Sequence, residues 1–201
     1  MLNLLASFAL LIIAMTVHEF AHGWVAYRLG DPTAKYSGRL TLNPLAHIDL
    51  FGTIILPLLL FMSTGFAIGW AKPVPINYWA LKNPKKDIIW VGLAGPLANI
   101  AFALSLSLIW RIIPLSYFVA VVFEKLIYIN LLLGVFNLIP IPPLDGSRIV
   151  MGILPDDLAS GYAAIEPYGF IIVAALAWLG MFNFLVWPLV KIISGVLKIP
   201  L

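Results

Sequence analysis

The stretch Ile88–Trp110, IIWVGLAGPLANIAFALSLSLIW, runs for 23 residues without a charged side chain. A helix that crosses the hydrocarbon core of a bilayer needs about 20 apolar residues, so this stretch is long enough. Of the 201 residues in the chain, 62% are hydrophobic and 10% are charged, whereas soluble domains have about 45–50% and about 25%. Because so few charges cannot cover a soluble globule, the composition excludes an ordinary soluble enzyme, a disordered chain and a nucleic-acid binder. The sequence predicts an all-α polytopic membrane protein.

Further apolar stretches on both sides of Ile88–Trp110 predict a bundle of about five to six transmembrane helices. Phe51–Trp70 is charge-free but contains Gly52 and Pro57, so we expect it to be kinked or partly re-entrant. The tail Pro188–Leu201 is expected to form a short interfacial helix. The other expected spans are Leu2–Leu29, Phe118–Ile139 and Tyr168–Val190.

The segments between these spans are polar. Within the first, Gly30–Leu50, residues Lys35–Leu42 alternate in polarity, which predicts a short strand-like or re-entrant loop after the first helix. Such a loop could offer an edge to an extended substrate, or it could be plain loop structure. Ala71–Asp87 is expected to be an interfacial loop, and Met151–Pro167 a second polar loop. Leu2–Leu29 lacks the basic start and the cleavage site of a signal peptide, and residues 1–201 are expected to form a single domain.

The motif HEFAH, from His18 to His22, is the sharpest chemical signal. The two imidazoles are four residues apart and therefore lie on one face of a helix, where they can bind one metal ion. Glu19 can take a proton from a water molecule on that metal. With a rise of 1.5 Å per residue, the motif lies roughly 9–15 Å below the membrane surface near Arg28. The alternative is a polar patch at the interface, but ionisable groups inside a membrane usually have a function.

A hydrolytic zinc site needs a third protein ligand. The chain has no cysteine, so the ligand must be a histidine or a carboxylate. Asp145 stands out, because it follows the helix-breaking prolines Pro140–Pro143 and precedes Gly146, where irregular backbone would line a polar cavity. His47 and Asp49 could cap a loop or could hydrogen-bond to the metal ligands from behind, and the sequence favours both roles equally. The remaining candidates, which solvation or a helix end explains, are Asp156, Asp157 and Glu166.

Together these motifs resemble the site-2 proteases, the intramembrane zinc metalloproteases of the M50 class, in their short bacterial and archaeal form. The resemblance rests on His18-Glu-x-x-His22 and on Asn137-x-x-Pro140-x-x-Pro143-x-Asp145-Gly146, and it extends in order from about Thr16 to Arg148. The PDZ and CBS domains of other branches have no counterpart in these residues. The middle segments that share the resemblance are Gly38–Pro44, His47–Asp49, Gly69–Pro75 and Ala94–Asn99.

The resemblance implies that His18, His22 and Asp145 bind one Zn²⁺ per chain and that Glu19 is the general base. It implies that Asn137 binds substrate or stabilises the oxyanion. The expected activity is hydrolysis of peptide bonds in or near transmembrane segments of membrane proteins, as in regulated intramembrane proteolysis. The expected location is a bacterial or archaeal plasma membrane, with the active site nearer the cytosol. The expected partners are a transmembrane substrate and the lipid bilayer, without nucleic acid.

Three questions remain open at the level of sequence. Asn99 is assigned to the substrate cavity, although a hydrogen bond to a neighbouring helix explains it equally well. A membrane metal transporter would also need His and Asp at membrane depth, but it would need more ligands along a path and has no use for Glu19; a non-catalytic scaffold would not need an intact site. Counted around five spans, basic residues divide evenly and give no orientation. The two groups are Arg28, Lys35, Arg39 and Arg111 on one side, and Lys72, Lys82, Lys85, Lys86 and Arg148 on the other.

Overall fold

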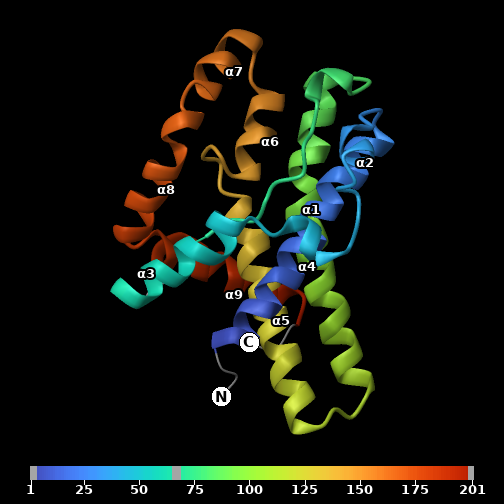
Figure 1. Cartoon of the computed structure of the whole chain (residues 1–201), viewed down its shortest axis with the longest axis vertical. Coiled ribbons are helices and arrows are strands. Elements are labelled where there is room, and N and C mark those ends of the chain that lie inside the picture. The colour runs from blue at the N-terminus through green and yellow to red at the C-terminus, as the bar shows by residue number, and fades with distance from the viewer. Residues whose placement is uncertain (1–3, 65–68, 199–201) are drawn as a thin grey trace.

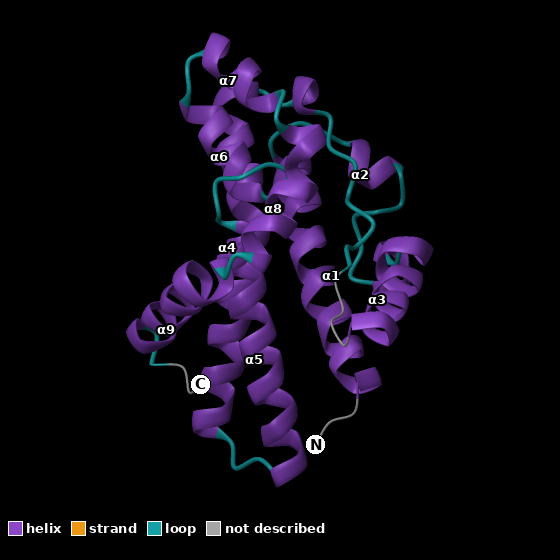
Figure 2. Ribbon diagram, turned by 90° about the vertical axis from the view of Figure 1, so that its left-hand side faces the viewer, coloured by secondary structure: helices purple, strands orange, loops and turns teal. Residues whose placement is uncertain are grey.

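The computed structural model describes residues 4–64 and 69–198, and every regular element within them is helical (Figures 1 and 2). The long central helix α4 (Pro84–Ile112) packs against α1 (Leu4–Arg28), α5 (Tyr117–Asn137) and α6 (Asp145–Ile153). The predicted all-α fold is confirmed for these residues.

Four helical segments are long and apolar enough to cross a membrane: Ala6–Arg28, Pro84–Ile112, Tyr117–Asn137 and Asp156–Trp178. The first three confirm the spans predicted around HEFAH, around Ile88–Trp110 and from Phe118. Leu2 and Asn3, which the sequence placed in the first span, lie outside the described residues. The chain is therefore a polytopic membrane protein.

The segment between α1 and α4 turns back on itself at the side of the bundle. A π-helix (Leu50–Ile55) and α3 (Leu56–Thr64) follow one another there, and together they are too short to cross a bilayer. The backbone N–H of Trp70 then donates to the carbonyl oxygen of Gly52 at 3.0 Å, so the chain comes back beside its own entry point. Of the two possibilities for Phe51–Trp70, the structure supports the re-entrant one; residues 65–68 lie outside the described residues.

The predicted strand at Lys35–Leu42 is wrong. The chain instead forms the one-turn helix α2 (Thr33–Tyr36) followed by bends, and no strand occurs in the part of the chain that the structure describes. The carboxylate of Asp31 accepts a hydrogen bond from the backbone N–H of Thr33 at 2.9 Å, a local bond that favours a turn over extended backbone. An edge for an extended substrate is therefore absent from this loop.

The C-terminal part also differs from the prediction. The predicted polar loop Met151–Pro167 is largely helical: α6 ends at Ile153, and α7 (Asp156–Ala163) begins after an extended break at Leu154 and Pro155. The predicted span Tyr168–Val190 is split: α8 (Gly169–Trp178) is followed by a turn at Gly180, whose φ of +94° is a backbone conformation that favours glycine. After this turn a π-helix (Phe182–Val186) and α9 (Trp187–Val196) run back against α5. A helix in the tail is thus confirmed up to Val196, where α9 ends, and residues 199–201 lie outside the described range.

Candidate metal centre

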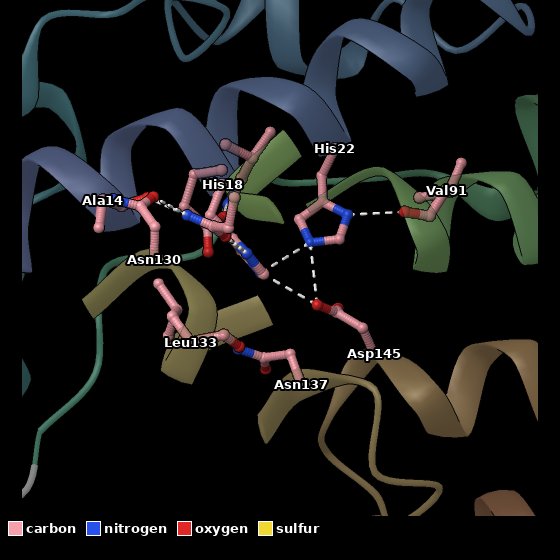
Figure 3. Close-up of polar contacts among 11 residues, drawn as sticks. Ala14, His18, His22, Val91, Asn130, Leu133, Asn137 and Asp145 are labelled. Carbon is pink, nitrogen blue, oxygen red and sulfur yellow. Dashed lines mark hydrogen bonds and ion pairs between the residues drawn. The ribbon is translucent and has the colours of Figure 1, made fainter. Parts of the chain in front are cut away.

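Helix α1 presents its two histidines to the interior of the bundle. His18 and His22 are both 6% exposed, and their Nε2 atoms are 3.1 Å apart. Figure 3 shows both rings projecting from α1 toward the same point. The predicted helical spacing therefore produces a pair of imidazoles at one place, as the sequence implied.

The third group comes from the other end of the fold. Asp145 is the first residue of α6, and its Oδ2 lies 3.0 Å from Nε2 of His18 and 3.2 Å from Nε2 of His22, although 123 residues separate it from His22. A tight turn aims it there, since a Cβ on Gly146 would lie 2.3 Å from the carbonyl oxygen of Leu138. Within the described residues this is the one group of three histidines and carboxylates able to hold a metal ion.

Hydrogen bonds on the far side of each ring show that the three groups fit a cation. Nδ1 of His18 lies 2.6 Å from Oδ1 of Asn99, and Nδ1 of His22 lies 2.7 Å from the carbonyl oxygen of Val91. Because these oxygens only accept, each Nδ1 carries the hydrogen and each Nε2 presents a lone pair. Two lone pairs and a carboxylate oxygen then face one another at 3.0–3.2 Å, close to the roughly 3.3 Å between ligands of a tetrahedral zinc with bonds of about 2.0–2.1 Å.

Gly95 of α4 keeps this space open. A Cβ at this position would lie 2.3 Å from Nε2 of His22 and 2.6 Å from Nε2 of His18. The point where a side chain would begin is therefore the point at which the ligand atoms converge. Gly95 thus leaves room for an ion between α1 and α4.

We expect Gly95→Ala to lower zinc affinity at least about tenfold, since a methyl group cannot share the site with a metal and two imidazoles. Zinc titration of the purified protein followed by metal analysis measures the effect. Gly161→Ala in α7 is the matched control, because a Cβ there meets nothing within 4 Å. Equal affinity in the two variants would show that the ion binds elsewhere.

Glu19 lies beside the histidines and is held by the segment that follows the re-entrant Phe51–Trp70. The backbone N–H of Val74 donates to Oε2 of Glu19 at 2.8 Å. Pro73 and Pro75 on either side have no N–H, so Val74 supplies the donor of this tripeptide. The segment is anchored further along, where the N–H of Asn77 donates to the buried carboxylate of Asp31 at 2.7 Å.

A cavity of about 220 Å³ opens over these groups. Burial raises the pKa of the Tyr78 hydroxyl, which keeps this group neutral and able to donate a hydrogen bond. Arg148 also faces the cavity and is paired with Glu166, with Nη1 and Oε2 3.0 Å apart. Asn137 lines the cavity too, and its Nδ2 donates to the carbonyl oxygen of Leu133 at 3.0 Å. The lining residues are His18, Glu19, His22, Pro73, Val74, Ile76, Tyr78, Val91, Gly92, Asn137, Pro143, Asp145 and Arg148.

The other residues singled out in the sequence lie away from the cavity lining. Asn99 is fully buried behind His18. His47 and Asp49 have loop-capping contacts: Nε2 of His47 lies 2.9 Å from the carbonyl oxygen of Thr41, and Asp49 accepts from the N–H of Gly52. Asp156 pairs with Lys85, Glu166 pairs with Arg148, and Asp157 is in the first turn of α7. The sequence analysis missed Val74, Asp31 and Asn130, because loop and interhelical contacts leave no periodic signal.

Comparison with known proteins identifies the family to which this sequence is similar. The model of peptidase family M50 matches residues 6–117 and 115–179. The chain is 39% identical to a Bacillus subtilis protein provisionally named zinc metalloprotease YwhC, over 90% of this chain and 84% of that protein. It is 29% identical to Rip2 of Mycolicibacterium smegmatis, also provisionally named a zinc metalloprotease, over 82% of this chain and 63% of that protein. Zinc metalloprotease MJ0392 of Methanocaldococcus jannaschii is 26% identical over 73% of this chain and 34% of its own length. No solved structure matches the chain significantly.

Proposed function

Because the chain belongs to peptidase family M50, we propose that it is an intramembrane zinc metalloprotease that hydrolyses peptide bonds in or near transmembrane segments of membrane proteins. The observation that carries the proposal is the convergence of His18, His22 and Asp145 beside Glu19, at a cavity inside a bundle of membrane-spanning helices. Ionisable groups are costly at such a position unless they bind an ion or move protons.

In this proposal His18, His22 and Asp145 hold one zinc ion, and Glu19 moves protons. A zinc ion at this place would act as a Lewis acid that polarises the scissile carbonyl and makes a water molecule more acidic. Glu19 takes a proton from the attacking water and later gives it to the leaving amine nitrogen. The hydrogen bond from Val74 fixes one carboxylate oxygen of Glu19, which holds the other oxygen in a defined direction.

Asn137 is proposed to contact the substrate. Its side chain lines the cavity, and the amide donates one hydrogen to its own helix at Leu133. The second amide hydrogen is available for a substrate carbonyl or for the oxyanion that develops during attack. Asn99 has no such access, so in this proposal it acts behind His18 instead of on the substrate.

The function is tested by purifying the chain in detergent, measuring bound zinc, and following cleavage of a single-span membrane peptide before and after chelation. We expect about one zinc per chain, loss of cleavage on chelation and recovery on adding zinc. Protein that binds no zinc, or that cleaves equally well after chelation, would contradict the proposal. The transporter alternative gains no support, since the described residues contain no second group of metal-binding side chains along the bundle.

The structure also regroups the basic residues, and this suggests an orientation. If Phe51–Trp70 crossed the membrane, Arg28 and Lys85 would lie on opposite sides. The N–H of Lys82 donates to the carbonyl oxygen of Leu29 at 2.9 Å, so the end of α1 and the start of α4 lie together. The end of the bundle at which α1 exits and α4 begins thus holds Arg28, Lys35, Lys82, Lys85 and Lys86. At its other end α4 has Arg111. By the positive-inside rule we infer that the α1 exit side faces the cytosol of a plasma membrane.

Cysteine labelling tests this orientation cleanly, because the chain has no native cysteine. Tyr36→Cys and Tyr117→Cys form a matched pair, since the two tyrosines are 83% and 87% exposed and neither change alters charge. In intact cells we expect a membrane-impermeant maleimide to label Tyr117→Cys and to label Tyr36→Cys only after permeabilisation. The reverse pattern would place the α1 exit side outside the cell.

A further inference from the structure

Two asparagines form a buried polar chain that ends on a candidate zinc ligand. Asn99 of α4 and Asn130 of α5 are both fully buried. Nδ2 of Asn130 donates to the carbonyl oxygen of Leu126 at 2.8 Å, and Nδ2 of Asn99 donates to Oδ1 of Asn130 at 2.7 Å. Oδ1 of Asn99 then lies 2.6 Å from Nδ1 of His18. Figure 3 shows Asn130 on the side of His18 that faces away from Asp145.

The backbone fixes the direction of this chain. The carbonyl oxygens of Leu126 and Ala14 can only accept, and each receives a hydrogen bond from an asparagine Nδ2, at 2.8 Å and 3.0 Å. Asn130 therefore turns its Oδ1 toward Asn99, and Asn99 uses both amide hydrogens, on Ala14 and on Asn130. Its Oδ1 is left facing His18, which must respond with a hydrogen on Nδ1.

Reversing Asn99 would be costly. Its oxygen would then face the oxygens of Ala14 and Asn130, and its NH₂ group would face the ring of His18. A buried polar group without a partner costs about 1–3 kcal/mol, and Asn99 is fully buried, so bulk water does not reach it. Two acceptors prevent this reversal, the carbonyl oxygen of Ala14 and Oδ1 of Asn130.

We propose that Asn130, acting through Asn99, is a positioning residue that holds His18 in the tautomer with hydrogen on Nδ1 and a lone pair on Nε2. Asn130 touches neither the metal position nor the cavity, and its effect reaches them through two hydrogen bonds. The inference rests on the proposed zinc site, because the lone pair on Nε2 matters only if a metal binds there. Groups that orient a ligating histidine typically change metal affinity or activity about 10–100-fold.

The test compares wild type with Asn130→Leu, which removes the acceptor at similar size. Zinc titration should show an affinity lower by about 10–100-fold. In the zinc-free protein labelled with ¹⁵N-histidine, nitrogen chemical shifts should show His18 with hydrogen on Nδ1 in wild type and a mixture of tautomers in Asn130→Leu. Asn130→Asp should restore both properties, since a carboxyl group that stays protonated in apolar surroundings accepts and donates like the amide.

Ser107→Ala is the matched control, because Ser107 is a buried polar residue of α4 whose hydroxyl has no hydrogen-bond partner. The zinc affinity of Ser107→Ala and the tautomer of His18 in this variant should equal those of wild type. If Asn130→Leu does not fold, Asn130→Ala removes the same acceptor without overpacking and should give the same two changes. Wild-type affinity and a single tautomer in the leucine or alanine variant would overturn the inference. A wild type that binds no zinc would refute the proposed function instead, and the tautomer measurement would still decide the inference.

Discussion

Glu19→Gln should abolish most proteolysis while zinc stays bound. The loss of a general base costs about 10²–10⁴-fold in rate, and here the same carboxylate serves both proton transfers. The structure makes this a clean substitution, because the side-chain oxygen of glutamine can still accept the hydrogen bond that Val74 donates to Glu19 at 2.8 Å. The loop over the cavity should therefore keep its place. Cleavage of a single-span substrate and metal analysis of the same preparation measure the two properties.

The zinc content of Glu19→Gln decides between the possible roles of this carboxylate. Equal zinc with lost cleavage confirms a role in proton transfer. Loss of zinc would show that Glu19 is a ligand or a structural partner, and unchanged cleavage with bound zinc would show that another group activates water. Zinc flux into liposomes that survives Glu19→Gln, with no cleavage by wild type, would favour the transporter.

Asp145→Ala should lower zinc affinity and activity together. Tetrahedral structural sites bind zinc with about 10–16 kcal/mol, so one of four ligands is worth roughly 3 kcal/mol, on the order of 100-fold in affinity. Oδ2 of Asp145 lies 3.0 and 3.2 Å from the Nε2 atoms of the two imidazoles, and without this carboxylate the proposed ion would lose its one negatively charged ligand and keep two neutral ones. Competition with a chelator of known affinity gives the change.

Asp156→Ala is the control for this experiment. Like Asp145, Asp156 is an aspartate in the first turn of a helix, here α7, which follows α6 in the chain. Its carboxylate, however, pairs with Lys85 at the surface. An exposed ion pair contributes about 0–1 kcal/mol, so zinc affinity should not change. If Asp145→Ala behaved like Asp156→Ala, the third ligand would have to be another group.

Local pattern was enough to predict the parts of the fold that depend on neighbours in the chain. The absence of charge over Ile88–Trp110 predicted the membrane-spanning part of α4. The four-residue spacing of His18 and His22 predicted that both rings lie on one face of α1. Asp145 was found because prolines before it break a helix and a glycine follows it. In each case the determining contacts are within a few residues, where chain geometry alone sets the outcome.

Everything that depends on which helices meet was decided only by the tertiary structure. Hydropathy could not show that α3 returns to its own side, because a short re-entrant helix and a kinked span have the same composition. That ambiguity also hid the grouping of the basic residues, which became visible once the bond between Lys82 and Leu29 joined the end of α1 to the start of α4. Gly95 and Asn130 carry no signal in sequence, since their effect is the space or the hydrogen bond they give to a neighbouring helix. The sequence by itself thus determined three of the membrane spans and the chemistry of the candidate ligands, and packing between helices determined the path of the other segments and how those candidate ligands are held.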